Sequence, residues 1–136
     1  MTFKQKQDNF VENLTALGDW QERFNYIMEL GSDLPEITAQ RLTPENLIEG
    51  CKSRTYMRVF LDENGKISIQ GKSNSPVPVG LIAACAEVFC GLSPAEIAGE
   101  EIFFQTQSEL LQHLSITRQN ALCKMIKRIQ LLSQNI

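Results

Sequence analysis

The spacing of apolar side chains predicts a helix at the start of the chain. Phe3, Phe10 and Leu14 recur at helical intervals within residues 2–17, and polar side chains fill the positions between them. Gly18 follows as a helix stop. The pattern therefore predicts an amphipathic helix over residues 2–17.

A second helical run begins directly afterwards. Asp19 can cap it, with Glu22 three positions later completing a capping box, and Gly31 is the predicted end. Residues 32–44 contain many turn-forming residues and little periodicity, so we expect a long surface connection rather than a domain linker. The apolar face of this second helix comprises Trp20, Phe24, Ile27 and Leu30.

The pattern changes to that of strands in the middle of the chain. Residues 55–61 are rich in aromatic and branched side chains, and residues 66–70 alternate, with Ile67 and Ile69 on the inward side. The turn sequence of residues 62–65 joins them, which predicts a β-hairpin.

Helical spacing returns in the second half. After a polar, proline-bearing loop at 73–78, the pattern predicts a helix over 79–90, and a capping box opens a short helix over 93–99. Residues 103–104 are expected to form a buried turn. The final helix is expected to be capped by Ser115 or Thr117. Its apolar face comprises Leu122, Met125, Ile126, Ile129 and Leu132.

Strands in one block between helices predict an α+β fold, and 136 residues with 43% hydrophobic content predict one domain spanning residues 1–136. The longest apolar stretch, 77–92, is too short to span a membrane and contains Glu87. A net charge of −3 without long charged runs argues against binding to nucleic acid or anionic membranes. With a polar start that lacks a secretory pattern, we expect a cytoplasmic chain whose partners are proteins.

Candidate chemistry centres on residues 47–56, where Cys51 follows Gly50 on a bend between two strand-like segments; residues 47–49 could add a short strand. Lys52 and Arg54 place cations near the sulfur, and cations stabilise the reactive thiolate. The alternative is that Cys51 is simply a small, half-buried loop residue.

The remaining candidates favour structural roles. We expect Cys85, Cys90 and Cys123 to pack in the core. A single histidine, His113, cannot build a zinc site without several converging cysteines, so a structural or surface role is expected. Phosphate-loop and serine-nucleophile motifs are absent from the sequence.

Arg118 is a cation in the first turn of the last helix, where the helix dipole disfavours positive charge. It could form a salt bridge to Glu45 or Glu49, or it could serve partner binding or the sulfur site. The sequence leaves both open.

Five segments of the chain together match the pattern of a known family: 27–35, 48–53, 79–82, 92–97 and 112–122. Through these segments the chain resembles the SufE family of sulfur acceptor proteins, the partners of SufS-type cysteine desulfurases. The resemblance implies a small curved antiparallel sheet with helices packed on one side, similar to the IscU-like iron–sulfur scaffold fold.

This resemblance implies that Cys51 takes sulfur as a persulfide from the desulfurase, whose activity it stimulates, and delivers it to the SufBCD assembly complex. The chain would be a carrier and activator rather than a self-standing enzyme. It would hold no cofactor, because pyridoxal phosphate belongs to the desulfurase. The implied supporting or partner-binding residues are Gly50, Lys52, Ser53, Arg54, Asn74 and Arg118.

The chain departs from the family pattern at three places. Lys52 replaces a usual glutamine, residues 72–74 replace a frequently acidic loop, and Ile116 replaces a frequent proline. The first two changes add positive charge, so we expect a desulfurase surface with different electrostatics.

Two other functions are conceivable for Cys51. An iron–sulfur scaffold or adaptor would bind metal or cluster there, but such sites need several convergent ligands. A redox sensor would form a sulfenate and would require a nearby resolving cysteine.

Overall fold

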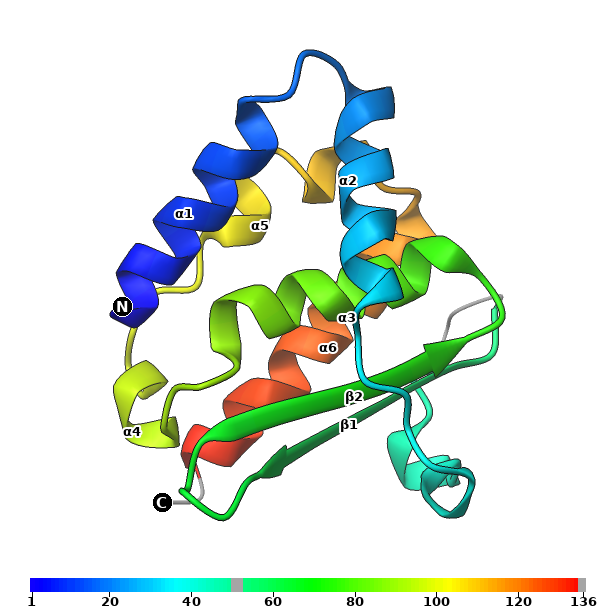
Figure 1. Ribbon diagram of the computed structural model, residues 1–136, viewed down its shortest axis with the longest axis vertical. Coiled ribbons are helices and arrows are strands. Elements are labelled where there is room, and N and C mark those ends of the chain that lie inside the picture. Colours follow the sequence, from blue (N-terminus) through cyan, green and yellow to red (C-terminus); the bar gives the residue numbers. More distant parts are fainter. Residues whose placement is uncertain (50–52, 135–136) are drawn as a thin grey trace.

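The computed structural model describes residues 1–49 and 53–134, and it confirms the α+β class (Figure 1). Longer helices flank one central hairpin, and short helical turns fill the connections. The elements are α1 (Phe3–Thr15), α2 (Trp20–Ser32), η1 (Ala39–Arg41), η2 (Pro44–Asn46), β1 (Thr55–Leu61), β2 (Ile67–Ser73), α3 (Pro76–Phe89), α4 (Pro94–Ile97), α5 (Phe104–Gln107), η3 (Leu111–His113) and α6 (Ile116–Gln134).

The predicted hairpin forms, but β2 extends to Ser73 and the two-stranded sheet lacks the curvature that the resemblance implied (Figure 1). β1 and β2 pair antiparallel, from Thr55 opposite Ser73 to Leu61 opposite Ile67. The amide of Asp62 donates to the carbonyl of Lys66 at 2.8 Å, which closes the turn. Gly65 has a φ of 74°, a conformation that glycine adopts without steric cost.

Isolated bridges extend the hairpin on both edges. Leu47 pairs antiparallel with Tyr56 of β1, and Glu36 pairs parallel with Gly71 of β2. The predicted short strand at 47–49 is therefore present as one bridge residue rather than as a full strand.

One face of the hairpin is buried beneath helices. Met57, Ile67 and Ile69 point inward and are almost completely inaccessible, while the alternate positions of both strands stay partly exposed. Figure 1 shows α3 running along the hairpin, and α3 and α6 also contact each other. This arrangement agrees with the expectation of helices on one side of the sheet.

Helices α2 and α3 cross at two glycines. A Cβ atom on Gly80 would lie 2.7 Å from Cγ2 and 2.8 Å from the carbonyl oxygen of Ile27, so only glycine fits this crossing. Gly31 approaches the backbone of Gly80 in the same place. The prediction that Gly31 ends α2 is therefore wrong: it serves close helix packing, and α2 continues to Ser32.

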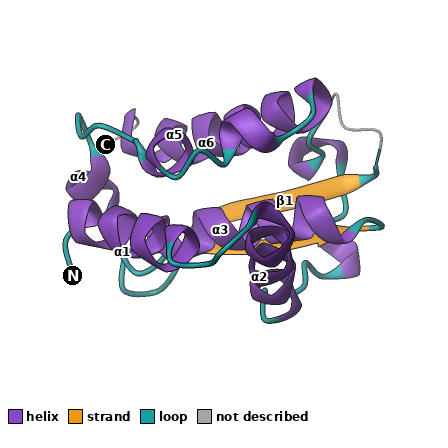
Figure 2. Cartoon of the chain, turned by 90° about the horizontal axis from the view of Figure 1, so that it is seen from above, coloured by secondary structure: helices purple, strands orange, loops and turns teal. Residues whose placement is uncertain are grey.

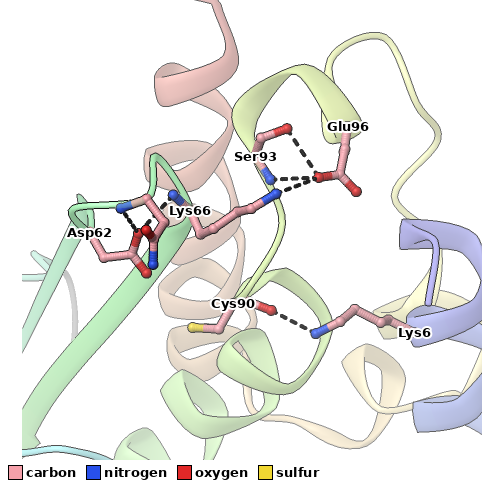
Figure 3. Close-up of polar contacts among 7 residues, drawn as sticks. Lys6, Asp62, Lys66, Cys90, Ser93 and Glu96 are labelled. Atoms are coloured by element: carbon pink, nitrogen blue, oxygen red, sulfur yellow. Dashed lines mark hydrogen bonds and ion pairs between the residues drawn. The ribbon is translucent and has the colours of Figure 1, made fainter.

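The helix ends use local polar side chains. Asp19 accepts a hydrogen bond from the amide of Glu22 at 2.9 Å, as predicted, but the Glu22 carboxylate accepts from the amide of Gly18 at 3.1 Å instead of that of Asp19, so the predicted capping box is not complete. Ser93 donates through its amide and hydroxyl to Glu96, at 3.0 and 3.1 Å, so the capping of α4 is also confirmed (Figure 3). Ser115, rather than Thr117, caps α6 by accepting from the amide of Arg118 at 3.3 Å.

The predicted loop at 73–78 is too long. Helix α3 already begins at Pro76, since proline at the first helical position has a suitable φ and lacks only an amide that would be unpaired there. Pro78 is therefore part of the first turn of α3.

Gln7 is a buried polar residue that fixes α1 to the turn before α5. Its Nε2 donates to the carbonyl of Glu101 at 3.0 Å, and its Oε1 accepts from the amides of Phe103 and Phe104, at 2.8 and 3.2 Å. The predicted burial of Phe103 and Phe104 is confirmed. Helix α1 contacts α3 and α5, and Figure 2 shows it next to α3. None of the described helices has the length and apolarity needed to cross a bilayer.

Candidate functional site

The candidate site is the connection that leads into β1. Gly50, Cys51 and Lys52, three of the residues proposed from the sequence, lie outside the described residues. Both ends of the connection are described, and they are tied together. The amide of Ile48 donates to the carbonyl of Thr55 at 2.8 Å, and the Leu47–Tyr56 bridge lies just beyond. The described ends of this connection, up to Glu49 and from Ser53, are therefore held together at the edge of the hairpin.

Two cations of α6 hold the incoming side of this loop. Arg128 donates to the carbonyls of Met57 and Leu47, each at 3.1 Å, and so joins β1 to the segment beside it. Lys124 Nζ donates to the carbonyl of Glu49 at 2.7 Å. Burial lowers the pKa of the half-buried Arg128 guanidinium, although arginine remains charged in proteins.

The outgoing side of the loop is held by the residues that follow β2. The amide of Arg54 donates to Oδ1 of Asn74 at 3.1 Å, so the structure brings together two of the proposed site residues. Thr55 is fully buried, and its hydroxyl lies 2.9 Å from that of Ser73 and 3.4 Å from the carbonyl of Ser53. The side chains of Arg54 and Asn74 themselves are exposed.

Arg118 lies at the start of α6 and is half-buried. Within residues 1–49 and 53–134, no ion pair connects it to Glu45 or Glu49, so the salt-bridge alternative is not observed there. The neighbouring Ile116 is 76% exposed, so this departure from the family pattern places an apolar side chain on the surface.

The described cysteines differ in exposure. Cys85 is fully buried, and burial raises the pKa of its thiol. Cys90 is partly buried, and burial is also the main reason that the pKa of its thiol is raised. Cys123 is exposed, so its predicted core position is wrong. The buried stripe of α6 contains Leu122 and Ile126, and position 123 is rotated about 100° from Leu122, towards solvent.

His113 packs against an aromatic side chain. Its ring stacks on Trp20 with the centroids 3.8 Å apart, and its Nδ1 lies 3.0 Å from the carbonyl oxygen of Glu109. Arg23 covers the Trp20 ring at 5.0 Å. Among residues 1–49 and 53–134, no group of three histidine, cysteine or acidic residues is arranged to hold a metal ion.

Lys124 and Arg128 are site residues that the sequence reasoning missed. They are four positions apart on α6 and therefore lie on one side of the helix, at the edge of the apolar face. The sequence signal for them is a pair of cations four positions apart at the border of the apolar face of the helix.

Comparison with known proteins agrees with this architecture. A solution structure of a hypothetical protein from Thermus thermophilus matches with a TM-score of 0.77, covering 96% of this chain and 94% of that one at 16% identity, which shows a shared fold. An uncharacterised SufE-like protein of Rhizobium etli is 33% identical over 132 residues, covering 94% of this chain and 89% of that protein.

The family model for SufE, described as an Fe–S metabolism associated domain, matches residues 8–133. That match includes the loop, both strands and nearly all of α6. It supports a role in sulfur transfer or iron–sulfur metabolism. The chain belongs to the SufE family.

Proposed function

We propose that this chain carries sulfur for iron–sulfur cluster assembly, with Cys51 as the acceptor. A SufS-type cysteine desulfurase would be the donor and the SufBCD complex the recipient. The observation that supports this most is that the described residues on both sides of Cys51 are held in place, by the hydrogen bonds of Ile48 to Thr55 and of Arg54 to Asn74. A reactive residue on a short loop held by a rigid hairpin is well placed to meet a partner.

The transfer needs one thiolate. The sulfur of Cys51 attacks the terminal sulfur of the donor persulfide, a new sulfur–sulfur bond forms, and the bond to the donor cysteine breaks. The donor leaves as a thiolate and Cys51 carries the persulfide. Attack by a recipient thiolate on the outer sulfur then returns Cys51 to its starting form, so no external oxidant or reductant is required.

The charges near the loop favour this chemistry. Arg54 contributes a cation three positions after Cys51, and Lys124 holds the carbonyl of Glu49 two positions before it. Positive charge favours the thiolate over the thiol. The charge of Lys52, adjacent in sequence, acts in the same direction.

A relay assay with radiolabelled sulfur tests the proposal. The full-length chain is incubated with desulfurase, cysteine and SufBCD, and both desulfurase turnover and label on the recipient are measured. We expect Cys51→Ser to abolish the stimulation and the onward transfer. Cys123→Ser is the matched control, because Cys123 is also exposed, and it should behave as wild type. Equal relay by Cys51→Ser and wild type would contradict the proposal.

A further inference from the structure

A cationic pocket lies beside the candidate site, between α6 and the segment that enters the loop. Its volume is about 280 Å³. The wall from α6 contains Lys124, Lys127, Arg128 and Leu131, and the opposite wall contains Pro44, Leu47 and Glu49.

The charge of this pocket is unbalanced. Three cations face a single carboxylate, that of Glu49, in a chain whose overall charge is −3. Arg128 and Lys124 direct hydrogen bonds to main-chain carbonyls, which do not neutralise them. The side chain of Lys127 is exposed and forms no hydrogen bond or ion pair with any described residue. The pocket is therefore complementary in charge to an anionic group.

The pocket also has apolar walls. Leu131 is 48% exposed, which is unusual for a large aliphatic side chain in this chain, and Leu47 and Pro44 lie across from it. Cations beside an aliphatic surface match a partner segment in which an acidic residue has an apolar neighbour in the sequence. A free phosphate or a nucleic-acid backbone would use the charge but leave the apolar walls uncovered.

We propose that this pocket is a docking site for an acidic segment of the desulfurase, with one carboxylate between Lys124 and Lys127 and an apolar neighbour on Leu131. The inference rests on the proposed function and deepens it. The pocket adjoins the loop directly, because Lys124 and Arg128 already bind the carbonyls of Glu49 and Leu47. A partner anchored there would lie next to Glu49, the last described residue before Cys51 in the sequence.

Lys127→Glu tests the proposal, since Lys127 has no contact whose loss would disturb the fold. Binding of the full-length chain to the desulfurase is measured by titration calorimetry at low and high salt. We expect the Kd of Lys127→Glu to rise roughly five- to tenfold at low salt, with a weaker salt dependence than wild type. Lys127→Arg keeps the charge and should retain wild-type affinity.

Lys4→Glu is the matched control. It makes the same change of charge on α1, and the exposed ion pair it removes, Lys4 to Asp8 at 2.8 Å, contributes little to stability. Its affinity for the desulfurase should stay close to wild type. An equal loss of affinity in Lys127→Glu and Lys4→Glu would show that binding depends only on the net charge of the chain, and it would overturn the pocket assignment.

The failure of this inference can be distinguished from failure of the proposed function. If Lys127→Glu binds like wild type while wild type still takes sulfur on Cys51, the pocket proposal is overturned and the carrier function stands. If wild type takes no sulfur from the desulfurase, the proposed function fails. Weaker binding by Lys127→Glu, with sulfur loading restored at saturating desulfurase, supports both.

Discussion

The amide nitrogen of Ile48 lies 2.8 Å from the carbonyl oxygen of Thr55, and this hydrogen bond joins the two described ends of the connection whose sequence contains Cys51. Beneath it, Arg128 of α6 bonds to carbonyls on both sides of the closure, at Leu47 and Met57. The segment that enters the connection is thus attached both to the hairpin and to the last helix. We therefore expect the hydrogen bonds of Arg128 to contribute to the stability of the fold.

Arg128→Met should lower the free energy of unfolding by about 2 kcal/mol, because two carbonyls lose a charged hydrogen-bond donor. Denaturant titration measures the effect. Lys127→Met is the control on the same helix, and we expect it to change stability by less than about 0.5 kcal/mol. Equal stabilities of Arg128→Met and wild type would show that the two hydrogen bonds contribute nothing to folding.

Gly80→Ala should destabilise the protein by about 2 kcal/mol or more, because the added methyl group would overlap Ile27 at the crossing of α2 and α3. Thermal and denaturant unfolding report the loss. Gly18→Ala provides the comparison, since its new Cβ would meet only Glu22 at an ordinary 3.5 Å. A wild-type unfolding midpoint for Gly80→Ala would refute the close crossing.

The helices and the hairpin could be predicted because their patterns are local. Periodic apolar residues mark α1, α2, α3 and α6, and the turn at 62–65 marks the hairpin. The predicted helix boundaries are less accurate where the same residue type can either end a helix or belong to it. Gly31 was expected to stop a helix, but it serves close packing against Gly80. Pro76 was placed in a loop, but it begins α3.

The candidate site could be predicted only in part. A cysteine after glycine and beside cations is visible in a short window, so the sequence predicts Cys51 as the candidate, and that prediction lies outside the described residues. The support from Lys124 and Arg128 was missed because it joins residues separated by 71 to 81 positions. Only the packing of α6 against the hairpin edge brings them together. Cys123 was placed in the core because hydrophobic neighbours alone do not fix the side of a helix on which a residue lies.

Glu96 should make stability depend on pH. Its carboxylate accepts hydrogen bonds from the amide and hydroxyl of Ser93 and lies 3.5 Å from Lys66 Nζ (Figure 3). These contacts, the Ser93 amide foremost, lower the pKa of Glu96 below its ordinary value of 4.5. Because the folded pKa is lower than the unfolded one, the stabilisation is complete above the unfolded pKa and disappears as pH falls through the folded pKa.

The comparison of wild type with Glu96→Gln tests this sign. Unfolding free energies are measured from pH 7 down to the acid range. The advantage of wild type should be constant near neutrality and should shrink once the pH falls below about 4.5. An advantage that grows on acidification would contradict the assigned contacts.

The cysteines should differ in reactivity according to their exposure. In Cys51→Ser, a water-soluble thiol reagent should label Cys123 first, because it is exposed in the folded chain. Cys85 should react only on unfolding, since it is buried and burial raises the pKa of its thiol. Peptide mapping over time measures both rates. Similar rates at Cys85 and Cys123 would be inconsistent with the packing of α3.

The most direct test of the carrier function is site-resolved mass spectrometry of the Cys123→Ser chain after incubation with desulfurase and cysteine. We expect the peptide that contains Cys51 to gain the mass of one or more sulfur atoms, and we expect a reductant to remove this added mass. The mass gain should be absent when Cys51 is also changed to serine. Sulfur on Cys90 alone, or an unmodified Cys51 peptide while the desulfurase turns over, would contradict it.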